Sequence, residues 1–348
     1  MGGKKASPVP FVPSGVGEEC TFVNIRMLIV TDEFSRNRPN RFNLHAQRGR
    51  RCARGARPPA CTRRHSDVRW DVLVVDNNST DGTAGVVRQY RETWDRSAAL
   101  RIVTEQQQGL AFARQRAVDE ARGKLVAFLD DDNLPAPDWV AEVVSFAEEH
   151  PNAGAFAGQL TGEYEVEPPR SFGLVKGLFA INDCEETFSY SKMGTGEFAP
   201  GAGLVVRKDA WQRHVPHKLD STGISGESRA GGGADLEAQW HLHEAGYEVW
   251  HNADMVAKHK MPADRFRPEY LKRFFEGIGK SRHRTRMMRF EPWQRPLAIP
   301  IFWLNDLRKL VRLYWQYRHK LGDRFVWGKA QMLKTMLIRP FFGGVMYG

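Results

Sequence analysis

Two apolar runs in the first half of the chain end abruptly in acidic and amide side chains. Residues 71–75 read Asp-Val-Leu-Val-Val and lead into the loop 76–79, which reads Asp-Asn-Asn-Ser. Residues 125–129 read Leu-Val-Ala-Phe-Leu and lead into the segment 130–133, which reads Asp-Asp-Asp-Asn. Continuous apolar runs of this length are typical of strands buried on both faces of a sheet. The polar clusters therefore stand where two buried strands end.

Helical patterns separate these strands along the chain. Residues 82–94, 109–122 and 137–149 are each expected to form a helix, and residues 100–103 form a further short strand. The alternation predicts an α/β fold, Rossmann-like, with a mostly parallel sheet and helices on both faces. Ligands of such folds bind at the carboxyl ends of the strands. Both acidic clusters are predicted to lie at that edge.

Charge divides the chain into three parts. Residues 35–69 contain eleven Arg, one Asp and almost no apolar side chains, residues 70–264 carry a net charge of −13, and residues 265–348 carry +14. We predict an atypical arm over residues 1–69, either disordered or translated from a shifted reading frame. An acidic α/β domain follows over residues 70–264. A basic, aromatic and helical tail is expected over residues 265–348.

The composition excludes several classes of protein. Apolar residues make up 41% of the chain and charged residues 26%, which is the balance of a globular protein. The acidic central part argues against a nucleic-acid partner, and no apolar run is long enough for a membrane-spanning helix. The chain opens without the basic-then-apolar pattern of a signal peptide. Its four cysteines lack close pairing, so we expect a cytoplasmic protein.

The acidic segment 130–133 is the sharpest indication of chemistry. Three adjacent carboxylates repel one another, so a compact site needs a cation. Hard divalent ions prefer oxygen ligands and can bridge to substrate phosphates. The alternative is a solvated acidic turn. The loop 76–79 could hydrogen-bond a base or ribose, and its alternative is ordinary turn chemistry.

Two later residues are further candidates. Asp235 follows three glycines and opens a helix, so it could be a general base on a mobile loop or a plain helix cap. His259 could complete a metal site, or it could be an exposed histidine between Lys258 and Lys260.

The motifs together resemble the family 2 glycosyltransferases of the GT-A fold. The resemblance is carried by five segments in the family's order and covers about residues 70–290: residues 74–83, 109–117, 128–133, 201–211 and 233–235, with His259 after them. Residues 130–140 are similar to a cyanobacterial subgroup that builds hormogonium polysaccharide.

The resemblance implies a role for each matching residue. Asp76, Asn77, Arg114 and Asp130 would bind the nucleotide of a sugar donor. Asp132 and His259 would hold Mn²⁺ or Mg²⁺ at the donor's pyrophosphate.

Asp235 would deprotonate the acceptor hydroxyl for direct, inverting attack at the anomeric carbon. The expected activity is therefore sugar transfer from a nucleotide-sugar donor to a growing glycan or a lipid-linked acceptor in polysaccharide biosynthesis. The basic tail could lie on an anionic membrane surface, at the inner face of the plasma membrane.

This chain departs from the family pattern in two places. Ala234 precedes Asp235 where the family has an acidic residue, and residues 24–31 offer only a poor version of the family's first strand. The second departure could leave the chain inactive, so one alternative is a catalytically defective paralogue that acts as a binding protein. Two further alternatives on a similar fold are a retaining glycosyltransferase and a nucleotidyltransferase.

Overall fold

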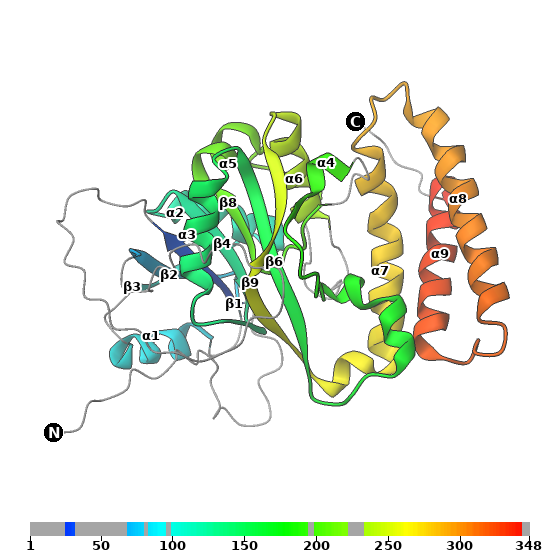
Figure 1. Ribbon diagram of the computed structural model, residues 1–348, viewed down its shortest axis with the longest axis horizontal. Coiled ribbons are helices and arrows are strands. Elements are labelled where there is room, and N and C mark those ends of the chain that lie inside the picture. The colour runs from blue at the N-terminus through cyan, green and yellow to red at the C-terminus, as the bar shows by residue number, and fades with distance from the viewer. Residues whose placement is uncertain are drawn as a thin grey trace, which may run out of the picture.

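The computed structural model describes residues 25–31, 68–79, 83–94, 99–193, 198–221 and 233–342. Within these residues nine strands form one sheet in the order β3-β2-β1-β4-β8-β6-β9-β5, and β7 pairs with β9 (Figure 1). The strands are β1 (Ile25–Thr31), β2 (Trp70–Asp76), β3 (Ala99–Thr104), β4 (Leu125–Asp130), β5 (Asn133–Pro135), β6 (Ala153–Tyr164), β7 (Phe188–Ser189), β8 (Leu204–Arg207) and β9 (Glu248–Met261).

Helices follow or flank these strands. The α-helices are α1 (Thr83–Thr93), α2 (Leu110–Glu120), α3 (Trp139–Glu149), α4 (Tyr190–Met193), α5 (Lys208–His214), α6 (Ala234–Glu244), α7 (Pro268–Met287), α8 (Arg295–Gln316) and α9 (Arg324–Phe342). Short 3₁₀ helices are η2 (Arg170–Leu174), η3 (Lys176–Phe179) and η4 (Ala263–Phe266).

Alternation along the buried strands creates a core on each face of the sheet. In β2, Leu73 and Val75 pack with α2, α5 and α6 on one face. Val72 and Val74 pack with α1 and α3 on the other face. The predicted α/β fold with helices on both faces is therefore confirmed, and so is the helical tail.

The strand directions differ from the mostly parallel sheet that the sequence predicts. Among the described strands only β2–β3 and β6–β9 pair in parallel. β1 runs antiparallel to both β2 and β4, and β8 runs antiparallel to both β4 and β6. A buried apolar run has the same sequence pattern in a parallel and in an antiparallel sheet, so the pattern does not indicate the strand's direction. The direction depends on the strands with which it pairs. β2 and β4 still point the same way, so their carboxyl ends share one edge.

Most of the predicted arm over residues 1–69 lies outside the described residues. The exceptions are residues 68–69 and β1, where the sequence indicates a poor strand and the structure has a central one. The disordered or frameshifted origin of the arm stays a prediction.

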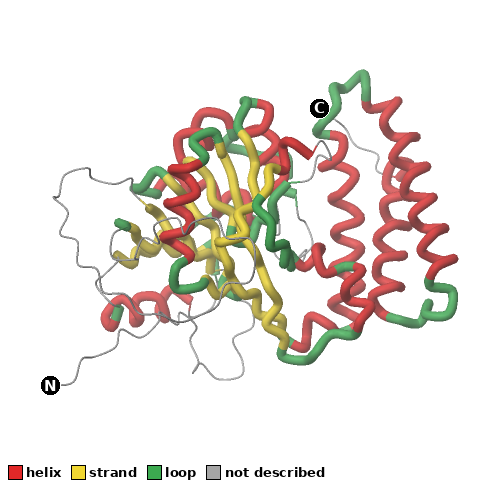
Figure 2. The backbone as a smooth tube through the Cα atoms, viewed as in Figure 1, coloured by secondary structure: helices red, strands yellow, loops and turns green. Residues whose placement is uncertain are grey.

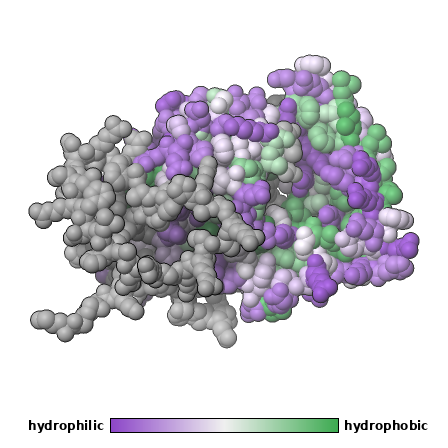
Figure 3. All heavy atoms as spheres, viewed as in Figure 1, coloured by the Kyte–Doolittle hydropathy of each residue, from purple (hydrophilic) through white to green (hydrophobic). Residues whose placement is uncertain are grey.

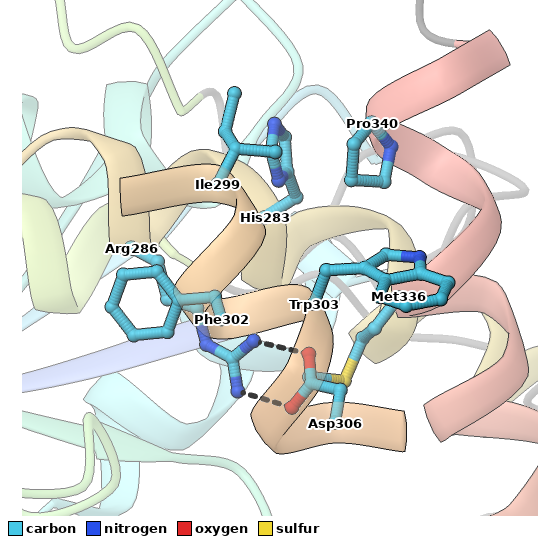
Figure 4. Close-up of a pocket in the computed structure, with 8 residues that line it drawn as sticks. All are labelled: His283, Arg286, Ile299, Phe302, Trp303, Asp306, Met336 and Pro340. Carbon is cyan, nitrogen blue, oxygen red and sulfur yellow. Dashed lines mark hydrogen bonds and ion pairs between the residues drawn. The ribbon is translucent and has the colours of Figure 1, made fainter. Parts of the chain in front are cut away.

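The tail forms a layer beside the sheet. Helices α7, α8 and α9 stand side by side in Figures 1 and 2, and their apolar faces form a third core with η2 and η3. A buried ion pair joins α7 to α8 inside this layer (Figure 4). Arg286 Nη1 and Nη2 donate to Asp306 Oδ2 and Oδ1 at 2.5 and 3.1 Å, and the guanidinium lies 5.0 Å from the centre of the Phe302 ring. The cavity beside the pair, ≈10 Å³, has room for about one water.

We expect Asp306→Ala to lower the free energy of unfolding by about 3 kcal/mol, because it leaves the Arg286 charge uncompensated against apolar neighbours. Urea denaturation monitored by circular dichroism measures this change. Asp264→Ala is the matched control, since Asp264 pairs with Arg267 at an exposed position, and its effect should stay within about 0.5 kcal/mol. Equal effects of the two substitutions would contradict the structural role of the buried pair.

Candidate active site

The carboxyl ends of β2 and β4 form one polar edge of the sheet. β1 lies between the two strands, and its register places Ile25 opposite Asp76 and Arg26 opposite Asp130. Asp76 and Asp130 therefore end neighbouring strands on the two sides of β1. This is the edge at which α/β sheets bind ligands.

Asn133 organises the turn that holds the three carboxylates. Its side chain is buried, its Oδ1 accepts a hydrogen bond from the Asp130 backbone N–H at 3.0 Å, and its Nδ2 donates to Asp132 Oδ1 at 3.0 Å. An amide supplies both a donor and an acceptor, so it can fix both ends of the turn. The sequence analysis assigned no role to this residue.

The pairing of β5 with β9 brings His259 to the acidic turn. Asn133 stands opposite His259 in this pairing, and the Lys260 N–H donates to the Asp132 carbonyl at 2.8 Å. His259 Nε2 consequently lies 3.2 Å from Asp132 Oδ2. The imidazole is buried, which removes the alternative of an exposed histidine, and its Nδ1 has no hydrogen-bond partner among the described residues.

A cation from the tail occupies the centre of this cluster. Arg265, on η4, donates a short hydrogen bond from Nη2 to Asp132 Oδ2. Its Nη1 lies 2.6 Å from His259 Nε2. Burial raises the pKa of Asp132, but the hydrogen bond and charge of His259 together with the Arg265 guanidinium lower it to about 2. Arg265 is not among the residues predicted from the sequence. The sequence marks it only as a basic residue shortly after His259.

The loop after β2 is held by Asn77 rather than left open. Asn77 Nδ2 donates to the carbonyls of Glu105 and Gln107 at 3.2 and 2.6 Å, and its Oδ1 accepts from the Gly109 N–H at 2.8 Å. These bonds tie the end of β2 to the segment between β3 and α2. Asp76 accepts from the Ser79 N–H at 3.0 Å and is buried. The amide of Asn77 is therefore engaged by the protein backbone.

Asp235 lies on the first turn of α6 and pairs with Arg114 of α2. Arg114 is buried, also donates to the Gly201 carbonyl at 3.1 Å, and lies 5.0 Å from the centre of the Phe128 ring. Phe128 precedes Asp130 on β4, so this pair lies near the same end of that strand. A Cβ at Gly201 would collide with the Asp235 carboxylate, which explains the glycine.

Buried polar side chains of α6 fix its position. Gln239 exchanges hydrogen bonds with both backbone groups of Ala199, at 2.9 and 3.0 Å. Glu237 accepts from the N–H groups of Asp220 and Ser221 at 2.7 and 2.8 Å. The sequence analysis did not single out either residue. Their bonds hold the helix that presents Asp235.

The site offers two side chains that could hold a divalent metal. Among the described residues no group of three or more His, Cys, Asp or Glu side chains gathers at one point. Asp132 Oδ2 and His259 Nε2 nevertheless converge on a position that the Arg265 cation shares. A carboxylate oxygen and an imidazole nitrogen suit Mn²⁺. Mg²⁺ is commonly held by one or two carboxylates, with substrate phosphates and water completing its coordination. The donor set fits a metal that is bound together with a diphosphate.

Comparison with known proteins identifies the class. Residues 60–210 match the family model described as Glycosyl transferase family 2. Glycosyltransferase AglE of Haloferax volcanii is 27% identical over 236 residues, which are 67% of this chain and 69% of that protein. These matches support membership of the family 2 glycosyltransferases. The chain is a glycosyltransferase.

Two further proteins are similar to this chain. The glucosyl-dolichyl phosphate glucuronosyltransferase of Haloferax volcanii is 22% identical, over 60% of this chain and 65% of that protein. This chain thus spans about two thirds of the length of both Haloferax relatives. A solved structure of the mannosyltransferase PcManGT from Pyrobaculum calidifontis, in complex with GDP-Man and Mn²⁺, aligns with a TM-score of 0.48 and 22% identity, over 79% of each chain.

Arg265→Gln should tighten Mn²⁺ binding in the absence of nucleotide by about tenfold, because the metal then no longer displaces a bound guanidinium from Asp132. Isothermal titration of the apoprotein with Mn²⁺ measures the change. Arg267→Gln removes a nearby exposed arginine and should leave the affinity unchanged. Unchanged or weaker Mn²⁺ binding by Arg265→Gln would show that the arginine does not compete for the site.

The low pKa of Asp132 predicts a stability contribution that depends on pH. The native pKa of about 2 lies below the ordinary 3.8, so the contribution is present above pH 4 and is lost as the pH falls towards 2. It amounts to about 2 kcal/mol in full, of which about 1 kcal/mol is lost by pH 3. Urea unfolding of the wild type and Asp132→Asn at pH 7, 4 and 3 tests this. The stability difference between the two proteins should shrink by that amount, and a difference independent of pH would contradict it.

Proposed function

We propose that this chain transfers a sugar from a nucleotide-sugar donor to a hydroxyl of a growing glycan or a lipid-linked acceptor, with inversion at the anomeric carbon. The observation that carries the proposal is the cluster of Asp132, His259 and Arg265 at the carboxyl end of β4, where Asp132 belongs to the residues 60–210 that match the family 2 model. This cluster combines a carboxylate, an imidazole and a guanidinium in one place. Such a combination suits a donor that brings its diphosphate together with a metal.

The donor's diphosphate end is assigned to this cluster. Asp132 and His259 would hold Mn²⁺ or Mg²⁺, which would stabilise the negative charge on the departing nucleoside diphosphate. Arg265 would exchange its contact with Asp132 for the diphosphate oxygens, since a guanidinium binds phosphate as well as carboxylate. The charge of Arg265 would thereby be compensated both without the donor, by Asp132, and with the donor, by its diphosphate.

The nucleoside end is assigned to the neighbouring strand end. Asp76 would accept hydrogen bonds from the base, and Asp130 would accept them from the ribose hydroxyls. Asn77 would contribute by shaping the loop, because its amide already binds three backbone groups.

The acceptor is assigned to Asp235. Its carboxylate would take the proton of the acceptor hydroxyl as that oxygen attacks the anomeric carbon. Direct displacement needs this single base and no protein nucleophile. In the structure Arg114 forms an ion pair with Asp235. The Asp235 carboxylate would be free to accept a proton once the Arg114 guanidinium turns to the anionic donor. This coupling would make base activation depend on donor binding.

A lipid-linked acceptor is supported by the similarity to the glucosyl-dolichyl phosphate glucuronosyltransferase of Haloferax volcanii. That substrate belongs to the Haloferax protein, and for this chain we propose the same chemical class, a sugar on a polyprenyl phosphate. A role in building a polysaccharide such as hormogonium polysaccharide is the narrower form of this proposal.

Calorimetric titration with UDP, GDP and dTDP, with and without Mn²⁺, tests the donor site. We expect one nucleotide to bind at least about tenfold tighter with the metal than without it, and Asp132→Ala should remove the metal-dependent part. Absence of binding by a folded sample would overturn the transferase assignment of these residues and favour a non-catalytic binding protein.

Asp235→Asn separates binding from chemistry. It should bind the nucleotide like the wild type but lose transfer by about 10²–10⁴-fold, the usual contribution of a general base. Glu244→Gln, at the far end of α6, is the control and should retain activity. The anomeric configuration of the product distinguishes inverting from retaining transfer. Release of pyrophosphate would instead indicate a nucleotidyltransferase.

A further inference from the structure

The outer face of α8 carries large apolar side chains along most of its length. Six large apolar side chains on this face and just before it are 60–73% exposed: Trp293, Leu297, Ile301, Leu304, Val311 and Trp315. From residue 297 onward they recur every three or four residues, with Arg308 in the remaining position of the series. That spacing places them on one side of the helix. We call this set the α8 stripe.

The stripe reverses the usual distribution of side chains on a surface helix. The single acidic residue of α8, Asp306, faces inward and is buried against Arg286. The outer side chains are apolar where solvent-facing residues are ordinarily polar. Figure 3 shows hydrophobic atoms gathered at the edge where α8 lies in Figure 1. A patch of this extent marks an interaction surface.

The charge around the stripe selects the kind of partner. Arg308 and Arg312 join Leu304, Val311 and Trp315 in lining an open hollow of ≈520 Å³. The tail from residue 265 onward has a net charge of +14, and the only acid of α8 is turned inward. A second copy would bring two such cationic surfaces together, which is unfavourable. An anionic lipid surface supplies both the apolar interior and the opposite charge.

We propose that α8 lies flat in the interface of an anionic lipid bilayer, with the aliphatic side chains of the α8 stripe inserted among the upper acyl chains and Arg308 and Arg312 reaching to the headgroups. No helix among the described residues is long and apolar enough to cross a membrane, so the contact is interfacial. The 22 residues of α8 span about 33 Å. Trp293 and Trp315 stand at the two ends, and indole rings favour the headgroup level.

Cosedimentation with vesicles tests this inference. The full chain should bind vesicles of phosphatidylcholine with phosphatidylglycerol and should bind pure phosphatidylcholine far more weakly. The double variant Leu297→Gln/Ile301→Gln should lower the partition coefficient by at least about tenfold. The control Val166→Gln/Met193→Gln changes two apolar side chains that are exposed elsewhere, and it should bind like the wild type.

A charge test runs in parallel. Arg308→Glu/Arg312→Glu should weaken binding to anionic vesicles by about tenfold or more. Arg122→Glu/Lys218→Glu makes the same charge change at exposed positions away from α8, and it should have little effect. All these positions are exposed, so circular dichroism should show the same fold for each variant.

Three results would overturn the inference. The first is equal vesicle binding by the wild type and the stripe variants, and the second is no binding by the wild type. The third is a dimer in sedimentation velocity without lipid that Leu297→Gln/Ile301→Gln converts to a monomer, because the stripe would then be a surface between copies of the chain. The vesicles contain no polyprenyl lipid, and the assay contains no nucleotide. A failure to bind vesicles therefore does not contradict the proposed transfer reaction. A failure of the transfer reaction likewise does not contradict the membrane contact.

Discussion

Negative charge accumulates where β4 ends, and the surrounding structure compensates it. Asp130 ends β4, and Asp131 and Asp132 follow it, so three neighbouring carboxylates repel one another at the end of a buried strand. Asn133 fixes the turn, His259 approaches from β9, and Arg265 supplies the positive charge. The segment that leads into the tail thus contributes to the electrostatics of this polar edge, and the tail helices form a separate layer.

The sequence predicts the local elements of the α/β part well, because their signals are local. The apolar runs at residues 71–75 and 125–129 became β2 and β4, and the amphipathic pattern of residues 109–122 became α2. Strand direction was predicted less well, since β1 and β8 run against β4. The direction of a strand depends on the strand with which it pairs, and hydrophobic periodicity does not indicate that partner.

The sequence predicts those residues of the candidate site whose type alone indicates metal or ligand binding. Asp132 and His259 were singled out from the sequence, and the register of β5 with β9 brings them together. Arg265 was missed because an arginine in a basic segment resembles its neighbours, and only the turn at η4 aims it at Asp132. Asn77 shows the opposite case, since a residue selected for ligand binding has its amide committed to the backbone.

The path of the chain from β9 into η4 joins the acidic cluster to the tail without an intervening linker. His259 lies near the end of β9, Arg265 on η4, and α7 begins at Pro268. A ligand that removes Arg265 from Asp132 also removes an anchor of the first turn before α7. Thermodynamic reciprocity then requires that anything which holds α7 and η4 in place changes the affinity for that ligand by the same factor. Under the proposed function, donor binding and the position of the tail would therefore be coupled through Arg265.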